Sequence, residues 1–331
     1  MCIALISTAH PSYPLIVIDN RDEFLRRPTS CADWWPEPSN NVLGGRDLAR
    51  ATHGTWMGVT KEGKIAVLTN YRETTADEPS GVHSRGLIVN NWLTADPEQR
   101  QSTRDFVQGM VASSEIRNVG GFSLVCGYVN EPLAIVSNRS ANMDQISWIA
   151  TEKGQTLGLS NTTFGDRSWP KILDGEKLMK EAINAHVQAG EDEDQLINRL
   201  LQVLSRDTLP RLSEDSTLET YLLLLRQSLF VPVIGAQAEK SRAADEVAAA
   251  RDTDKVAAAR DTDKVPVESQ PPHDLLDKSF LQGAYGTQKQ TVVLVSANGR
   301  VRYFERTLYD NDVNAIAIGK GDRSFEFHVN R

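Results

Sequence analysis

The chain has 331 residues, of which 40% are apolar and 24% are charged. This composition is typical of a globular protein and excludes a wholly disordered, collagenous or fibrous chain. Lys and Arg total 36 against 44 Asp and Glu, so the net charge of -8 gives no overall positive field that would attract nucleic acid. Apolar runs such as Tyr221 to Leu225 are far shorter than the roughly 20 residues that cross a bilayer.

The chain begins with a predicted β-hairpin. Apolar and β-branched residues fill Cys2–Thr8 and Leu15–Asp19, with a turn around Ser12 between them. Cys2–Ile6 follows no basic leader and reaches His10 and Pro11 too soon to be a secretory core, so we interpret it as a strand. Further strands are predicted at Thr55–Thr60, Lys64–Thr69, Phe122–Tyr128, Leu133–Ser137, Ile146–Ala150 and Thr156–Ser160.

Helical periodicity dominates the middle of the chain, and strands return at its end. The predicted helices are His83–Leu93, Thr103–Ala112, Trp169–Val187 with Pro170 as its first residue, Asp192–Leu204 and Leu218–Leu229. The late strands are Thr291–Ser296, Arg300–Thr307 and Ser324–Val329. Strands, then helices, then strands predict an α+β layered sandwich and exclude the strict alternation of a parallel sheet.

One segment differs from the rest in composition. Residues 247–255 read VAAARDTDK, and residues 256–264 repeat the same nine letters. Two copies are too few for a solenoid, and the surrounding Gln237–Pro272 has no aromatic residue and few large apolar ones. We therefore predict one domain made of residues 1–236 and 273–331, interrupted by a disordered insertion, with a helical extension of the preceding segment as the alternative.

The cysteine count indicates a reducing compartment. Cys2, Cys31 and Cys126 form no C-x-x-C pair, and an odd number argues against a disulfide framework. We therefore expect a cytoplasmic protein. The six histidines show no metal-ligand spacing, and the sequence contains no phosphate-binding glycine loop, zinc-protease motif or serine nucleophile elbow.

The second residue is a candidate nucleophile. Initiator methionine is commonly removed before a small residue, which would leave Cys2 with a thiol and a free α-amino group. That amine has an ordinary pKa of about 7.7–8.0 and can accept the thiol proton near neutral pH. One residue would then supply both nucleophile and base. The ordinary alternative is that Cys2 is a small buried apolar side chain.

The hairpin predicts charged neighbours for this cysteine. A turn centred near Ser12 places residue 2 opposite residue 22, so that Arg21 and Asp22 arrive beside the N-terminus. Arg21 would favour the thiolate, and Asp22 would hold or orient the amine. The alternative is that Asn20 to Glu23 form a turn whose charges pair locally.

Two asparagines end apolar strands. Asn70 follows Val67-Leu68-Thr69, and Asn161 follows Leu157 to Ser160. A side-chain amide at a strand end can donate to a developing oxyanion, although more often it only completes a turn. The Trp34-Trp35-Pro36 cluster could likewise border an apolar pocket, but plain packing is the slightly better interpretation.

Many short blocks of the chain, in order, resemble the NRDE family, also called transport and Golgi organization protein 2. The resemblance covers nearly everything outside Gln237–Pro272. The blocks are Met1-Cys2-Ile3, Asn20-Arg21-Asp22-Glu23-Phe24, Gly44-Gly45-Arg46-Asp47, Gly54-Thr55-Trp56-Met57-Gly58-Val59, Leu68-Thr69-Asn70-Tyr71-Arg72, His83-Ser84-Arg85-Gly86, Gly158-Leu159-Ser160-Asn161, Trp169-Pro170-Lys171 and Tyr285-Gly286-Thr287.

This resemblance implies a fold and a site. The family looks like the N-terminal nucleophile hydrolases of the choloylglycine hydrolase and penicillin V acylase group, which have an αββα sandwich. By motif, Cys2, Arg21 and Asp22 match the cysteine, arginine and aspartate of that group, Asn161 matches its oxyanion asparagine, and Asn70 is a second candidate. The chain departs from the pattern at Gln288, where the related segment often has arginine; that difference would alter the leaving group or acid, or abolish turnover.

The resemblance also implies roles in Golgi organisation, protein secretion and the handling of haem or acyl lipids, with peripheral Golgi, other membrane or mitochondrial association. Two function classes follow. A hydrolase would use Cys2 on an amide or thioester and need no cofactor, whereas a carrier would bind haem or an acyl lipid in the same pocket. Neither Cys31 nor Cys126 lies in a Cys-Pro haem motif, so haem would bind by pocket shape alone.

Overall fold

The computed structural model describes residues 2–71, 85–96, 101–113, 119–213, 216, 218–235 and 283–329. These residues form two antiparallel sheets. The first has the order β10-β1-β2-β11-β12-β13, and its strands are β1 Ile3–Ser7, β2 Leu15–Phe24, β10 Thr156–Ser160, β11 Tyr285–Val295, β12 Arg300–Thr307 and β13 Asp322–His328. The second runs in chain order, with β3 Asp33–Trp34, β4 Val42–Gly44, β5 Met57–Thr60, β6 Lys64–Asn70, β7 Phe122–Tyr128, β8 Leu133–Ser137 and β9 Ser147–Ile149.

Four of the described helices lie within two residues of their predicted bounds, and the last one is much shorter than predicted. They are α1 Arg85–Leu93, α2 Thr103–Ala112, α3 Pro170–Ala189, α4 Glu193–Leu204 and the short α5 Leu218–Tyr221, with 3₁₀ turns at Met143–Gln145 and Leu224–Arg226. Pro170 is the first residue of α3, and Gly190 ends that helix in the left-handed region at φ 63°. Asp192 and Gln195 close a capping box on α4.

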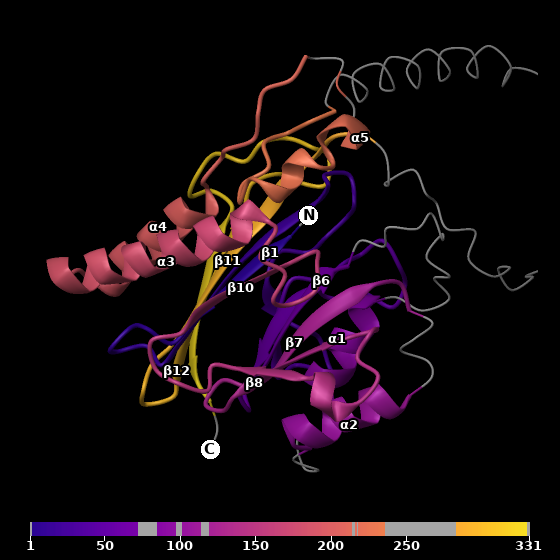
Figure 1. The fold of residues 1–331 in the computed structure, drawn as a ribbon, viewed down its shortest axis with the longest axis vertical. Coiled ribbons are helices and arrows are strands. Elements are labelled where there is room, and N and C mark those ends of the chain that lie inside the picture. The colour runs from indigo at the N-terminus through magenta and orange to yellow at the C-terminus, as the bar shows by residue number, and fades with distance from the viewer. Residues whose placement is uncertain are drawn as a thin grey trace, which may run out of the picture.

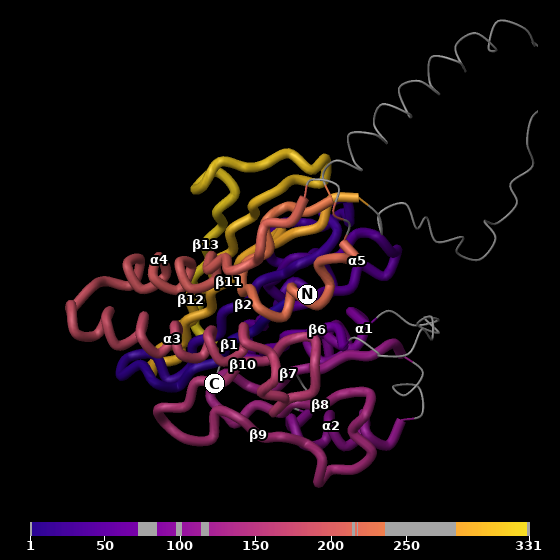
Figure 2. The backbone as a smooth tube through the Cα atoms, turned by 45° about the horizontal axis from the view of Figure 1, so that its top comes forward, coloured from indigo at the N-terminus to yellow at the C-terminus, as the bar shows by residue number. Residues whose placement is uncertain are grey.

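The helices cover the two outer faces of the paired sheets. Figures 1 and 2 show α3 and α4 on one side of the strands and α1 and α2 on the other. Met179, Ile183 and Leu200 of α3 and α4 pack on Ile16 and Ile18 of the first sheet. A corresponding cluster, which includes Val89, Trp92, Val107, Leu124 and Cys126, joins α1 and α2 to the second sheet. The result is a four-layer αββα sandwich, so the predicted fold class is confirmed.

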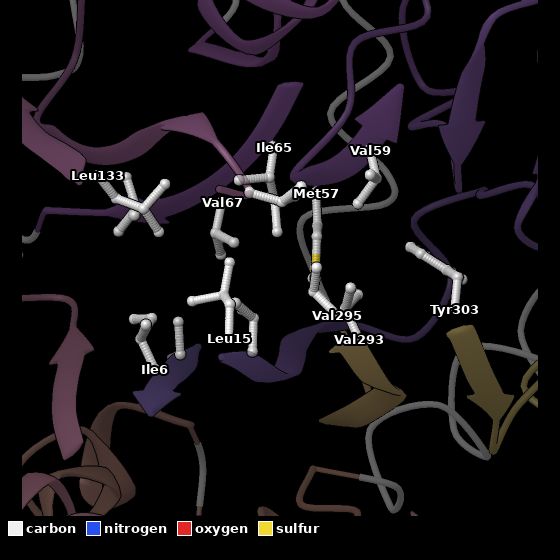
Figure 3. Packing of buried hydrophobic residues seen from close by; sticks show 14 of the residues in the cluster. Ile6, Leu15, Met57, Val59, Ile65, Val67, Leu133, Val293, Val295 and Tyr303 are labelled. Atoms are coloured by element: carbon white, nitrogen blue, oxygen red, sulfur yellow. The ribbon is translucent and has the colours of Figure 1, made fainter. Parts of the chain in front are cut away.

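The largest core lies between the sheets. Figure 3 shows Ile6, Leu15 and Val293 of the first sheet facing Met57 and Val67 of the second. Because alternate residues of a strand point to opposite faces, each of these strands buries one set of side chains here and the other set under helices. This alternation also decides which face carries each polar residue near the N-terminus.

Two strands of the first sheet are longer than the sequence predicted. β2 continues past Asp19 to Phe24, so the turn interpretation of Asn20 to Glu23 was wrong, and β11 begins at Tyr285 rather than at Thr291. Their polar residues are buried because each finds partners in the fold. Asn20, for example, donates to the carbonyl oxygens of Leu204 at 2.8 Å and Leu229 at 2.9 Å.

The predicted helix Leu218–Leu229 was also wrong. The helix stops at Tyr221 and is followed by a turn and a single 3₁₀ turn. The Ser228 hydroxyl donates to the Phe230 carbonyl at 2.6 Å and accepts from the Thr208 backbone at 2.9 Å, bonds that a continuous helix would not allow. The apolar spacing is satisfied by tertiary packing of Leu225 and Leu229 into two different clusters.

The predicted insertion Gln237–Pro272 lies outside the described residues, as does Met1. Among the helices that are described, none combines the length and apolar character needed to cross a bilayer.

Candidate active site

Strand pairing brings three of the candidate residues into one row. β1 lies between β2 and β10, and Ile3 pairs with Asn20 on one side and Ser160 on the other. One residue earlier, Cys2 therefore lies between Arg21 and Asn161. The sequence prediction that residue 2 lies opposite residue 22 was wrong by one position. The observed register buries Leu15 and Val17 beside Ile6 between the sheets, and a one-residue slip would turn them to the other face.

The two faces of the first sheet separate the chemistry around Cys2. Its side chain belongs to the face of Ala4 and Ile6, which lines the space between the sheets. Asp22 belongs to the face of Ile16 and Ile18, which α3 and α4 cover. The backbone nitrogen of Cys2 lies in the plane of the sheet and so between these two environments.

Cys2 itself is buried and anchored by its backbone. Its side chain is 8% exposed, and Sγ donates to the Asp22 carbonyl oxygen at 3.7 Å. The Ser160 hydroxyl donates to the Cys2 carbonyl at 2.6 Å. Burial raises the pKa of the Cys2 thiol to about 11. The thiol is therefore protonated at neutral pH and needs a nearby base in order to react.

Asp22 is held by β11. The Thr287 hydroxyl donates to Asp22 Oδ1 at 2.7 Å, and the Tyr285 hydroxyl donates to the Asp22 carbonyl at 3.1 Å. Thr287 is also the strand partner of Asp22. Burial raises the pKa of the Asp22 carboxyl, whereas nearby positive charge and this hydrogen bond oppose the shift.

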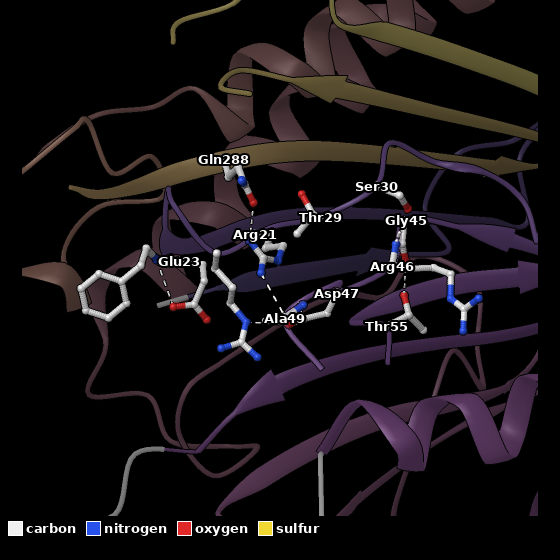
Figure 4. A network of polar contacts seen from close by, with 12 residues as sticks. Arg21, Glu23, Thr29, Ser30, Gly45, Arg46, Asp47, Ala49, Thr55 and Gln288 are labelled. Carbon is white, nitrogen blue, oxygen red and sulfur yellow. Dashed lines mark hydrogen bonds and ion pairs between the residues drawn. The ribbon is translucent and has the colours of Figure 1, made fainter. Parts of the chain in front are cut away.

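The guanidinium of Arg21 is engaged on the inter-sheet side. It hydrogen-bonds Gln288 Oε1, lies 3.9 Å from Asp47 Oδ2 and is stacked 4.7 Å from the centre of the Trp56 ring. Figure 4 shows Arg21 between Gln288 and Asp47. A bulge between Thr287 and Lys289 brings Gln288 to this position. These partners hold the Arg21 side chain on the same face of the sheet as the Cys2 thiol.

The two asparagines differ in their placement. Asn161 is 7% exposed, and its Oδ1 has no hydrogen-bond partner among the described residues. The Thr69 hydroxyl donates to the Ser160 carbonyl at 3.0 Å, so the end of β6 meets the end of β10 there. Strand alternation puts Asn70 on the face opposite to Thr69, which α1 and α2 cover. Asn161 is therefore the better placed of the two for a group bound at Cys2.

The structure adds titratable residues to which the sequence analysis gave no role. Lys171 in the first turn of α3 is fully buried, and the charges of Asp22, Cys2 and Asp19 oppose the lowering of its pKa by burial. Asp19 is 1% exposed, and burial raises the pKa of its carboxyl. Burial lowers the pKa of Arg85 at the start of α1, and Cys2 is among the charges that act on it.

Lys171 and Arg85 lie within sequence blocks that resemble the family, and this resemblance could have marked them as candidates. Asp19 lies in no such block.

The tryptophan cluster is packed. Trp35 is 4% exposed and donates to the Gly44 carbonyl at 3.0 Å, and the Trp34 ring lies edge-on to Phe327. Where the structure describes the chain, no group of three or more His, Cys, Asp or Glu side chains could hold a metal ion.

The sequence model of the family described as Transport and Golgi organisation 2 matches residues 1–310. The chain belongs to this family. It is 28% identical to the Transport and Golgi organization 2 homolog of Mus musculus, covering 92% of this chain and 90% of the relative. Identity to the Homo sapiens homolog is 26%, with 92% and 90% covered. An uncharacterized protein of Saccharomyces cerevisiae is 25% identical over 99% of this chain and 100% of its own length.

The chain also has similarities among solved structures. An N-acylethanolamine-hydrolyzing acid amidase ortholog of Caenorhabditis elegans matches with a TM-score of 0.42 and 12% identity, covering 60% of this chain and 85% of that chain. A variant of the conjugated bile acid hydrolase of Clostridium perfringens matches with a TM-score of 0.41 and 11% identity, covering 99% and 98%.

Proposed function

We propose that this protein is an N-terminal cysteine hydrolase that cleaves an amide or thioester bond. The observation that supports it is the row formed by Arg21, Cys2 and Asn161 across three neighbouring strands, with Asp22 on the opposite face of the sheet. Once Met1 is removed, the thiol lies on the same face of the sheet as Arg21 and Asn161, and the freed amine borders the side of Asp22. One terminus then carries both nucleophile and base.

In the first half of the reaction, Sγ of Cys2 forms a bond to the substrate carbonyl carbon while its proton passes to the neutral α-amine. The carbonyl oxygen becomes an oxyanion that the Asn161 amide stabilises by donating a hydrogen bond. The carbon–nitrogen or carbon–sulfur bond then breaks, and the α-ammonium returns its proton to the leaving group. An acyl group remains on Cys2.

In the second half, the α-amine takes a proton from water as the water oxygen attacks the acyl carbon. The bond to Sγ breaks, the sulfur recovers the proton, and a carboxylic acid leaves. Because burial raises the pKa of the thiol to about 11, the first half needs the amine to remove the thiol proton. The second half needs it to activate water. No cofactor enters this scheme.

A second candidate function is a non-catalytic carrier of haem or an acyl lipid. The protonated state of the buried thiol favours it, because a thiol without its base acts as an apolar packing group. In this case Cys2 fills space and the same residues surround a ligand. Both candidates are compatible with a role in Golgi organisation, which we propose from the names of the relatives. We also propose the role in protein secretion and the cytoplasmic, peripherally membrane-associated location that the sequence resemblance implies.

The decisive experiment compares wild type with Cys2→Ala on acyl-anilide and acyl-coenzyme A substrates, after intact mass has shown that Met1 is removed. Hydrolysis should fall by at least about 10³-fold, because the nucleophile is lost. Wild type should also accumulate an acyl adduct on the peptide Cys2–Arg21. Asn161→Ala should lower kcat by about 10²–10³-fold through the missing oxyanion donor.

Cys126→Ala is the matched control, since Cys126 is a second buried thiol and lies under α1 and α2. It should leave hydrolysis unchanged. Hydrolysis retained in Cys2→Ala, or full retention of Met1 in the native host, contradicts the enzyme. Haem or acyl-coenzyme A binding that survives Cys2→Ala, with no hydrolysis in either protein, supports the carrier instead.

A further inference from the structure

A buried cation lies on the helix-covered side of the candidate site. Lys171 is the second residue of α3, and its side chain is completely excluded from solvent. A lysine is seldom fully buried unless it is paired, because removing its charge from water is costly. We therefore expect an opposite charge close to the Lys171 ammonium.

The packing around α3 locates Lys171 beside Asp22. Its neighbours Trp169 and Ile172 belong to the apolar cluster that contains Tyr285, whose hydroxyl donates to the Asp22 carbonyl. Ile172 also approaches the backbone of β10, because a Cβ built on Gly158 would lie 3.0 Å from Ile172 Cγ2. The first turn of α3 is thus fixed over the ends of β2 and β10 where Asp22 lies.

The charges that act on Lys171 agree with this placement. Burial lowers the pKa of its ammonium, and Asp22 is the strongest opposing charge, followed by Cys2 and Asp19. From β11, the Thr287 hydroxyl donates to the same carboxylate at 2.7 Å, and the Tyr285 hydroxyl donates to the Asp22 backbone carbonyl at 3.1 Å.

Two other charges near the start of α3 are already engaged. Glu176, the next acidic side chain on that face of the helix, is paired with Arg167 at 2.7 Å. Arg226 is stacked 5.0 Å from the Trp169 ring.

We propose that Lys171 is a positioning residue of the Cys2 site, whose buried ammonium holds the Asp22 carboxylate and keeps the α-amino group of Cys2 neutral. This inference rests on the proposed function. A cation near a second amine disfavours protonation of that amine and also favours the thiolate over the thiol. Lys171 would therefore lower the pKa of both the Cys2 thiol and the Cys2 α-amino group. The amine would then be neutral, and able to act as a base, at a lower pH.

The test is the pH dependence of Cys2 alkylation by iodoacetamide in protein that has lost Met1. Alkylation is read from the tryptic peptide Cys2–Arg21, which separates Cys2 from the other two cysteines. Lys171→Met should raise the pH midpoint by about one unit or more, because the cation is lost. Lys171→Arg should keep the wild-type midpoint, since it preserves the charge.

Lys64→Met is the matched control. Lys64 is 2% exposed, donates to the Ala95 carbonyl at 2.8 Å and stands at the far end of β6 from Asn70, about 20 Å along the strand. It should leave the midpoint unchanged. Lys171→Gln serves the same purpose as Lys171→Met if the latter does not fold, because the amide is uncharged but still donates a hydrogen bond.

A folded neutral variant at position 171 with the wild-type midpoint would overturn the inference. So would a Lys171→Arg midpoint that rises as far as that of Lys171→Met. Because alkylation needs no substrate, the two proposals fail separately. If the neutral variants alter the alkylation midpoint but wild type hydrolyses no substrate, the hydrolase proposal is contradicted and the effect of Lys171 on Cys2 stands. If hydrolysis depends on Cys2 but the midpoints do not change, only the role of Lys171 is contradicted.

Discussion

At the scale of single residues, the two reactive groups of Cys2 have different surroundings. The thiol faces the space between the sheets with Asn161 and Arg21, and the backbone nitrogen borders the side of Asp22 and Lys171. In the proposed hydrolase, oxyanion stabilisation and amine orientation would therefore belong to opposite faces of one sheet. A substitution on one face should disturb one task with little effect on the other.

A second buried pair of titratable residues lies at the other end of β1. The Ser12 backbone donates to His10 Nδ1 at 3.1 Å, so His10 Nε2 carries the hydrogen that His186 Nδ1 accepts, also at 3.1 Å. His186 Nε2 then donates to the Asp192 carbonyl at 2.9 Å. His10 is neutral in this chain of bonds, and it cannot take a proton on Nδ1 without losing the bond from Ser12.

This chain predicts a pH-dependent stability. Burial lowers the pKa of His10 to about 4, below its ordinary value of 6.5. The unfolded chain therefore binds more protons between pH 4 and 6.5, and the free energy of unfolding rises with pH across this window and falls as pH drops. One histidine gives a slope of at most about 1.4 kcal/mol per pH unit.

Urea denaturation from pH 4.5 to 7.5 measures this slope. His10→Gln should flatten it, because the titrating group is gone, and His328→Gln, which alters an exposed histidine on β13, should not. Equal slopes for wild type and His10→Gln would show that the buried pair is not the source.

At the scale of elements, close backbone contact positions α1. A Cβ on Gly54 would lie 2.9 Å from Gly86 Cα, so the loop before β5 and the first turn of α1 touch only because both residues are glycine. Arg85, immediately before Gly86, is placed near Cys2 by this contact. The two motif blocks that contain these glycines are thus neighbours in space.

Gly54→Ala should lower the free energy of unfolding by about 1–3 kcal/mol, because backbone on both sides must move apart. Thermal and urea denaturation would measure the loss. Gly109→Ala in α2 is the control. Nothing lies within 4 Å of its Cβ position, and alanine there should stabilise the helix by about 0.5–1 kcal/mol. A neutral Gly54→Ala would show that the contact can relax.

Elements with strong periodicity were predictable, and polar strands were not. α2, β7, β8, β10 and β12 have the bounds that the sequence predicted. The first residues of β11, Tyr285 to Gln290, have polar composition and no alternation, yet all are buried. Their strand forms because β2 supplies hydrogen-bond partners along its whole length, which no local pattern reveals.

At the scale of the whole molecule, the ends of the long segment 236–282 meet. Ile234 and Tyr285 exchange two backbone hydrogen bonds of 2.9 Å, and Gly235 approaches the Gly283 carbonyl. The described residues on either side of this segment are therefore joined directly by backbone hydrogen bonds. The predicted disorder of Gln237–Pro272 stays a prediction.

Deletion of residues 237–272 should leave the fold intact and raise the free energy of unfolding by about 1 kcal/mol, because a shorter loop has less closure entropy to lose. Denaturation of the deletion variant beside wild type measures this. A loss of several kcal/mol would mean that the segment packs on the sandwich.

The sequence by itself determined the α+β class, most strands and helices, and the identity of Cys2, Arg21, Asp22 and Asn161 as candidates. These follow from periodicity, turn residues and short motifs, all of which are local. Tertiary structure alone decided the register that places Cys2 beside Arg21, the face given to Asn70 and the burial of Lys171. Register and face depend on which side chains the two sheets bury together, and that is settled only when distant segments pack.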